Sequence, residues 1–332
     1  MPGNYKKDGS GNEAGNYYPG TAVLQLYHPV HMTKYLLLYC LIAMSCRKQA
    51  DTPGVREYTV TPSQTDAAIS HFNAPHHAFI SGNRPSANAL LVFLPGTGGE
   101  PKHYRLFAQH AADLGFHVIN LMYPNEPAIN QVCASSGDIT AHSRARLEII
   151  DGTDRHPEIQ VNAANSIINR LAKMLAWLHS AHPDEKWGQY LNGAQPAWEK
   201  IIIAGHSQGA GHAGVIGKHY PVGRVIMFSG MDMLTNGQIP DWVNNTAGSE
   251  KYYALHHTQD ELLHVNIVKQ GWLALGMGAP QDAAASSLSA QALSTTATPA
   301  SILPVRFHNM TAVDIYVPKN KLNAAWTWLL GK

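Results

Sequence analysis

Charge is scarce in this sequence, and neither sign predominates. Asp, Glu, Lys and Arg make up 14% of the 332 residues, and the formal net charge is +1. A near-neutral chain without a basic stripe has no electrostatic means of attracting nucleic acid or an acidic partner. We therefore expect no nucleic-acid partner. The chain is also 45% hydrophobic, and at this length it can bury a sizeable core as one large α/β domain.

Cysteines, long apolar runs and metal-binding motifs are equally scarce. The three cysteines stand at positions 40, 46 and 133. No apolar run reaches the roughly 18 residues that indicate a membrane-spanning helix. The 19 histidines are scattered, and none belongs to a His-Glu-x-x-His motif. We therefore expect neither a helix that spans a bilayer nor a metal site.

The most informative stretch is Gly205-His206-Ser207-Gln208-Gly209. Three isoleucines at 201–203 precede it, as is typical of a buried strand, and small residues follow it. In this context Gly-x-Ser-x-Gly predicts a sharp strand-to-helix turn that exposes a serine hydroxyl above the sheet. The glycines are needed because the turn brings the strand and helix backbones close together. Ser207 is therefore the candidate nucleophile.

Two backbone N–H groups are candidates for stabilising the negative charge that develops on an acyl carbonyl oxygen. One belongs to Gln208, at the positive end of the helix that the turn begins. The other comes from the loop Pro95-Gly96-Thr97-Gly98-Gly99, which ends the apolar strand 89–94. We assign it to Thr97, with Gly98 as the alternative. The loop lacks the lysine of a phosphate-binding P-loop.

A serine hydroxyl needs a neutral imidazole to accept its proton and a carboxylate to orient that imidazole. Where the serine stands on such a turn, the acid and then the histidine follow it in the chain, each at the carboxyl end of a strand. Asp260 follows the second expected strand after the serine, 251–256, and is the favoured acid. It could equally cap a helix expected at 261–275. This chemistry requires no metal or organic cofactor.

The remaining candidates follow from the same order of residues. Asp232, which follows the expected strand 224–229, is the alternative acid. His308 is the only histidine beyond His264, and it lies after a short strand-like run. His308 is therefore the candidate base.

The hydrophobic pattern predicts the other elements of an α/β domain. Residues 124–160 are expected to be irregular and to shape a substrate site, with a short helical piece at 143–150. An Ala-, Ser- and Thr-rich stretch at 276–301 is expected to be a flexible loop near His308. The further expected elements are strands at 55–61, 76–81 and 117–123, and helices at 102–114, 162–180 and 322–330.

These motifs together resemble the α/β-hydrolase superfamily over residues 55–332. The segments 203–212 and 308–314 are similar to a little-characterised group of bacterial secreted serine hydrolases and esterases of this fold. The resemblance implies a mostly parallel central sheet with helices on both faces. Where the superfamily usually has His-Gly before the oxyanion residue, this chain has Pro95-Gly96. The resemblance does not indicate a substrate.

The expected function is that of an exported serine hydrolase, with a small-molecule or polymeric carboxylic ester as its substrate. The ester would be cleaved through an acyl-enzyme on Ser207. The same chemistry could act on an amide or peptide bond, or transfer the acyl group to another acceptor, because one fold hosts all these activities. A member that only binds a ligand or partner is the alternative from outside the enzymes.

The N-terminal region carries the features of an export signal. Residues 1–31 are rich in Gly, Asn and Tyr without periodicity, which is typical of a disordered or misassigned leader. The segment 32–46 begins with Met, has one lysine and about eleven mostly apolar residues, and ends in small residues before Cys46. It resembles a bacterial lipoprotein signal with Cys46 as the lipidated residue, although plain cleavage after Ser45 is the alternative. Residues 47–54 form a polar tether.

The expected location follows from this signal. The protein is either a cell-envelope lipoprotein or a periplasmic or secreted protein, and it meets a membrane only through an N-terminal lipid anchor. If Cys40 leaves with the signal and Cys46 carries lipid, the folded domain retains only Cys133. No intramolecular disulfide could then form.

Overall fold

A computed structural model describes residues 54–84, 86–244 and 248–332. The expected leader (1–31), the signal (32–46) with Cys46, and the tether up to residue 53 lie outside the described residues. Within the described ranges, no helix has the length and apolar character needed to cross a membrane.

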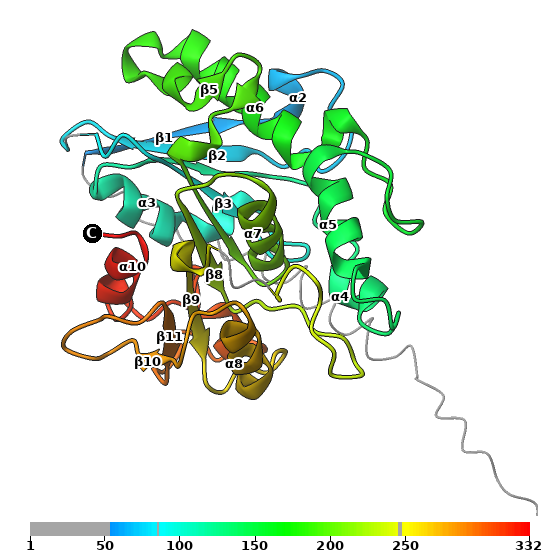
Figure 1. Cartoon of the computed structure of the whole chain (residues 1–332). Helices are drawn as coiled ribbons and strands as arrows, with labels where there is room; N and C mark the ends of the chain where they lie inside the picture. Colours follow the sequence, from blue (N-terminus) through cyan, green and yellow to red (C-terminus); the bar gives the residue numbers. More distant parts are fainter. Residues whose placement is uncertain (1–53, 85, 245–247) are drawn as a thin grey trace, which may run out of the picture. The chain divides into compact units, whose positions relative to one another are not determined.

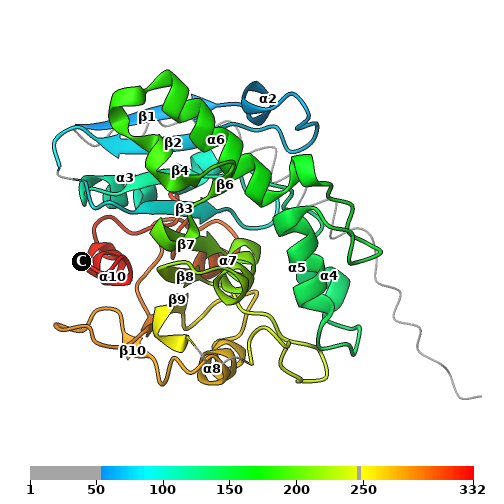
Figure 2. The ribbon, with the colours of Figure 1, turned by 45° about the horizontal axis from the view of Figure 1, so that its top comes forward.

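The described chain is a mixed α/β structure built on one nine-stranded sheet. The strand order is β1-β2-β4-β3-β7-β8-β9-β11-β10, and Figure 2 shows most of these strands stacked in this order from top to bottom. The pairs β1–β2 and β2–β4 are antiparallel, and every other pair in the sheet is parallel. The prediction of a mostly parallel central sheet is therefore confirmed. The strands of the sheet are β1 (Val55–Val60), β2 (His76–Ser81), β3 (Leu90–Leu94), β4 (His117–Asn120), β7 (Ile201–His206), β8 (Arg224–Phe228), β9 (Tyr252–His257), β10 (Gln281–Asp282) and β11 (Ala292–Thr295).

Helices cover both faces of the sheet (Figures 1 and 2). One face carries α3 (Arg105–Asp113) and α10 (Asn323–Leu329), and the other carries α5 (Ala141–Asp151), α6 (Ile167–Ala181) and α7 (Gln208–His219). The remaining elements are α2 (Pro62–Thr65), α4 (Ile129–Cys133), α8 (Val265–Ala274), α9 (Arg306–Asn309), and a separate antiparallel pair, β5 (Leu191–Asn192) with β6 (Gln195–Pro196).

Two hydrophobic cores form because side chains alternate between the faces of a strand. In β3, Leu90, Val92 and Leu94 join the core beneath α5, α6 and α7, whereas Leu91 and Phe93 join the core beneath α3 and α10. Strands buried on both faces read as continuous apolar runs, which is why this part of the sequence was predictable.

Strand β7 lies in the middle of the sheet and carries the candidate nucleophile at its carboxyl end. It pairs in parallel with β3 on one side and β8 on the other, and all six of its residues are buried. The carboxyl ends of these parallel strands lie at the same edge of the sheet. The loops that follow them can therefore bring side chains from distant parts of the sequence together.

Three details of the sequence-based expectation are wrong. The stretch 276–301 is not one unstructured loop, because β11 pairs in parallel with β9 and β10 pairs with β11. The strand-like run before His308 is instead the short helix α9. The helix expected at 261–275 begins four residues later, at Val265, since residues 258–264 form a turn around Asp260.

Candidate active site

Ser207 occupies a strained turn between β7 and α7. Its φ is +54° and its ψ is −117°, a combination that L-residues rarely adopt and that costs on the order of 1–3 kcal/mol. The N–H of Ser207 donates to the carbonyl of Phe228 at the end of β8, at 2.8 Å, which anchors the turn to the sheet. Such strain persists only where the surrounding structure enforces it, and it is typical of functional sites.

The two glycines of the motif are required by close backbone contacts. A Cβ atom on Gly209 would overlap the carbonyl of Leu94 at the end of β3, and one on Gly205 would overlap the main chain of Gly209. Neither obstacle is a flexible side chain that could move aside. The reason given for these glycines from the sequence therefore holds in the structure.

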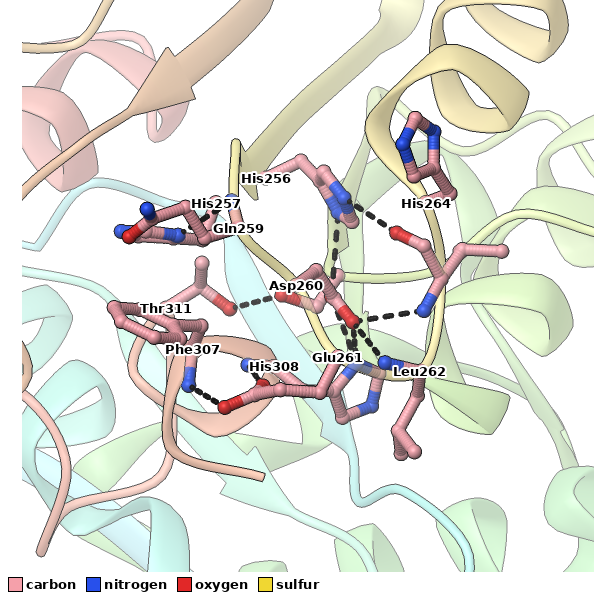
Figure 3. A network of polar contacts seen from close by, with 12 residues as sticks. His256, His257, Gln259, Asp260, Glu261, Leu262, His264, Phe307, His308 and Thr311 are labelled. Carbon is pink, nitrogen blue, oxygen red and sulfur yellow. Dashed lines mark hydrogen bonds and ion pairs between the residues drawn. The ribbon is translucent and has the colours of Figure 1, made fainter. Parts of the chain in front are cut away.

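Asp260 and His308 form a hydrogen-bonded pair, as Figure 3 shows. The Nδ1 atom of His308 lies 2.8 Å from Oδ2 of Asp260 and 3.0 Å from Oδ1, and both side chains are almost fully buried. Because a carboxylate only accepts, Nδ1 carries the hydrogen and Nε2 of the neutral ring is left with its lone pair. This is the tautomer that a general base needs.

Backbone N–H groups hold the acidic loop in place. Oδ1 of Asp260 accepts from the N–H groups of Leu262 and Leu263, each at 2.8 Å. The neighbouring carboxylate of Glu261 accepts from the N–H groups of Phe307 at 3.1 Å and His308 at 2.9 Å. The loop after β9 therefore fixes both the ring and the main chain of the candidate base (Figure 3).

The carboxylate of Asp260 remains charged in this environment. Burial alone would raise its pKa, but the hydrogen bond from His308, the electrostatic interactions with His308 and His256, and the N–H group of Leu263 together outweigh burial, so the pKa is lowered overall. A second histidine, His256, lies on its other side with Nδ1 3.6 Å from Oδ2. Burial lowers the pKa of His256 to about 4, so this ring is neutral near pH 7. Its Nε2 donates to the carbonyl of Leu263 at 3.0 Å.

His308 lies beside the serine turn through its contact with His206, the residue that precedes Ser207. The Nε2 atom of His206 donates to the main-chain carbonyl of His308 at 3.1 Å, and the two ring centroids are 5.0 Å apart. No hydrogen bond within the described part of the chain joins the Ser207 hydroxyl to His308. Such catalytic contacts are often long before substrate binds.

The two residues expected to supply oxyanion N–H groups touch each other. The Thr97 hydroxyl donates to Oε1 of Gln208 at 3.2 Å. A Cβ atom on Gly96 would lie 3.1 Å from Cβ of Ser207, which places the loop after β3 directly against the candidate nucleophile. The N–H of Gln208 belongs to the first turn of α7, where N–H groups have no acceptor within the helix.

Asp232, the alternative acid, is engaged elsewhere. Its carboxylate pairs with the guanidinium of Arg146 from α5, with Nε at 2.7 Å and Nη2 at 2.6 Å, and accepts from Trp242 Nε1 at 2.8 Å. Burial would raise its pKa, but the charge of Arg146 dominates and the pKa is strongly lowered. Arg146 also donates to the carbonyl of Gln208 at 2.9 Å. Asp232 therefore belongs to the buried support of α7 and not to the pair with His308.

Asn125 is a residue at this site that sequence reasoning missed. Its Nδ2 donates to the carbonyls of Gly96 at 2.9 Å and Gly99 at 2.8 Å, in the loop expected to supply an oxyanion donor. It follows β4, whose carboxyl end lies beside that of β3. Its position after a strand, at the edge of the sheet that carries the candidate site, was the one feature by which the sequence could have indicated Asn125. The identity of its partners depends on tertiary contacts.

Among residues 54–84, 86–244 and 248–332, no cluster of three or more His, Cys, Asp or Glu side chains could hold a metal ion. No protein-family model matches the chain, and no curated protein matches it significantly. The case for a function therefore depends on the geometry of this site.

Proposed function

We propose that the protein is a serine hydrolase of the α/β-hydrolase fold that cleaves a carboxylic ester through an acyl-enzyme on Ser207. One observation carries the proposal: a serine stands on a strained strand-to-helix turn, and the residue before it, His206, contacts the main chain of a histidine whose ring is held by a buried carboxylate. Ser207, Asp260 and His308 follow β7, β9 and β11 in that order, which is the order typical of this fold.

In the proposed reaction, the Ser207 oxygen attacks the acyl carbon and its proton passes to Nε2 of His308. Asp260 stabilises the imidazolium that forms, through Nδ1–H. The N–H groups of Gln208 and Thr97 bind the oxyanion of the tetrahedral intermediate. The C–O bond then breaks, the alcohol leaves with the proton from His308, and the acyl group stays on Ser207. Water, deprotonated by the same histidine, releases the acid and restores the serine.

An ester is the favoured substrate class because its carbonyl is less stabilised by resonance than that of an amide, and because an alkoxide is a far better leaving group than the amide anion that an amide would have to release. An amide or peptide bond, or transfer of the acyl group to another acceptor, would use the same residues. The pairing of Asp260 with His308 at 2.8 Å argues against a member that only binds a ligand, since such a protein has no need of an oriented base.

The proposal is tested by labelling the full-length chain with a fluorophosphonate probe, which reacts with activated serines. We expect labelling of the unmodified chain, and none of folded Ser207→Ala or His308→Ala. His264→Ala is the matched control, because His264 is exposed and Figure 3 shows it apart from the pair. A folded chain that stays unlabelled would overturn the proposal, whereas labelling leads on to a panel of acyl esters of graded length.

Export of the protein is a further part of the proposal, and it depends on the sequence of residues 32–46 alone. We propose that Cys46 is lipidated and anchors the protein to a cell-envelope membrane. Expression in a bacterium with radiolabelled palmitate should label the wild-type chain and not Cys46→Ser. Equal labelling of both chains would exclude Cys46 as the lipidated residue, and cleavage without label would favour a soluble exported form.

A further inference from the structure

We propose that Asn125 is a positioning residue that fixes the oxyanion-binding loop, through a ring of hydrogen bonds that it closes with Gln208 and Thr97. The inference depends on the proposed hydrolase activity, because it assigns a role within that reaction. It is carried by the hydrogen-bond geometry around residues 96–99.

The loop is a tight turn that leaves two N–H groups free of its own internal bond. The N–H of Gly99 donates to the carbonyl of Gly96 at 2.9 Å, and Gly98 has a φ of +63°. In a four-residue turn closed in this way, the N–H groups of the second and third residues point away from the closing bond. These are the N–H groups of Thr97 and Gly98, the two candidates for the second oxyanion donor.

Asn125 holds this turn from the side of β4. Its single Nδ2 group donates both of its hydrogens, one to the carbonyl of Gly96 and one to that of Gly99. The first and last residues of the turn are thereby tied to one rigid amide. The planar NH₂ group of the amide supplies two donors at this position, whereas a carboxylate of the same shape would supply none.

Gln208 connects this clamp to the nucleophile turn. Its Nε2 donates to the main-chain carbonyl of Asn125 at 2.9 Å, and its Oε1 accepts from the N–H of Ile129 at 2.8 Å and from the Thr97 hydroxyl at 3.2 Å. The contacts therefore run from Gln208 to Asn125, from Asn125 to the turn, and from Thr97 back to Gln208. The two expected oxyanion donors are held at a fixed separation by this closed ring.

The cost of burying Asn125 supports a role beyond packing. The residue is 1% exposed, and its Oδ1 has no hydrogen-bond partner among the described residues. A buried polar atom without a partner destabilises the folded state. The two donors of the same amide offset that cost only because they hold the carbonyls of the turn.

The test compares the wild-type full-length chain with Asn125→Asp and Thr97→Val. Asn125→Asp keeps the shape and removes both donors, while Thr97→Val keeps the backbone N–H and removes one contact of the ring at an exposed residue. Ester hydrolysis is measured per active site, after titration with a fluorophosphonate, together with inhibition by a trifluoromethyl ketone. The ketone forms a tetrahedral oxyanion on an activated serine, so its affinity reports on the oxyanion donors.

We expect kcat of Asn125→Asp to fall at least tenfold, towards the 10²- to 10³-fold loss that follows removal of a donor outright. Ketone inhibition should weaken in parallel and KM should change less than threefold. Thr97→Val should lose about threefold to tenfold in both kcat and ketone affinity. A purely structural role would instead reduce the fraction of titratable sites and leave kcat per site unchanged.

Two outcomes would overturn the inference, and they are distinguishable from failure of the proposed function. If the wild-type chain hydrolyses esters through Ser207 but both folded variants keep kcat and ketone affinity within a factor of two, the clamp has no such role. If Asn125→Asp does not fold, the test depends on Thr97→Val alone: kcat and ketone affinity within a factor of two of the wild-type values would overturn the inference. A wild-type chain that neither hydrolyses esters nor reacts with the probe overturns the proposed function, and the clamp with it.

Discussion

The imidazole of His206 donates to the main-chain carbonyl of His308 at 3.1 Å, although 102 residues separate them in the chain. The other ring nitrogen of His206 accepts from the Tyr104 hydroxyl at 3.3 Å, and that hydroxyl accepts from the N–H of Gly96 at 3.1 Å. His206 therefore connects the proposed base with the oxyanion loop. Burial lowers its pKa to about 3, which keeps the ring neutral and able to serve both partners.

Replacing His206 by Phe should disturb catalysis without removing any group that touches the substrate. The ring volume is retained, but the carbonyl of His308 loses its donor, so we expect kcat per active site to fall about tenfold to a hundredfold. The measurement is steady-state ester hydrolysis after active-site titration. His219→Phe, at an exposed histidine near the end of α7, should leave kcat unchanged. Wild-type kcat in His206→Phe would contradict the linking role.

Asp260→Asn and Asp232→Asn should have different effects, because Asp260 orients the proposed base whereas Asp232 supports the fold. In Asp260→Asn the neutral amide no longer enforces the productive tautomer of His308, and kcat should fall by about 10³- to 10⁴-fold in a folded protein. Asp232→Asn leaves the buried charge of Arg146 without its counter-charge. It should lower the free energy of unfolding by about 3–5 kcal/mol while kcat per site changes much less.

Ester hydrolysis and chemical denaturation of the same two variants provide the check. The assignment of the two carboxylates would be reversed if Asp232→Asn abolished turnover in a stably folded chain while Asp260→Asn remained active.

Gly209→Ala should severely destabilise the fold, because its Cβ would overlap the carbonyl of Leu94 in the neighbouring strand. Backbone atoms at the centre of a sheet cannot move aside cheaply, so we expect a loss of about 3 kcal/mol or more of unfolding free energy. Gly223→Ala is the matched control, since its nearest neighbour would be 3.7 Å away. It should change stability by less than about 0.5 kcal/mol. Similar denaturation midpoints for the two variants would refute the close contact.

Stability should fall as the pH drops below about 6.5. Burial lowers the pKa of His76, His206, His212 and His256 in the folded state, so below the ordinary histidine pKa the unfolded chain binds protons that the folded chain does not. Stability therefore rises with pH through this window and is lost as pH falls from 6.5 towards 4. The lowered pKa of Asp260 acts in the same direction at lower pH.

Denaturation midpoints at pH 8, 7, 6 and 5 measure this effect. Each buried neutral histidine adds at most about 1.4 kcal/mol per pH unit. His212→Met offers a specific control, because neither ring nitrogen of His212 has a hydrogen-bond partner among the described residues. The variant should show a smaller loss of stability between pH 7 and 5. Midpoints independent of pH over this range would contradict the prediction, because they would show that the folded chain binds protons as readily as the unfolded chain.

The sequence by itself determined the features that depend on neighbouring residues. The isoleucines at 201–203 and the glycines around Ser207 indicated a strand, a tight turn and a helix, because burial and close backbone contact require those residue types locally. The resemblance carried by these motifs implied a mostly parallel sheet. The order of acid and then histidine that is typical where a serine stands on such a turn restricted the partners of Ser207 to later strand ends, which led to Asp260, with Asp232 as the alternative, and to His308.

Only the tertiary structure decided which of these side chains meet. Asp232 and Asp260 both follow a strand, and their roles differ because Arg146 from α5 reaches one and His308 reaches the other. The clamp at Asn125, the bond from His206 to His308, and the pairing of β11 with β9 join segments that no local pattern relates. Such contacts are set by how distant elements pack, and the physical reason is that hydrogen-bond partners for buried polar groups are chosen in three dimensions.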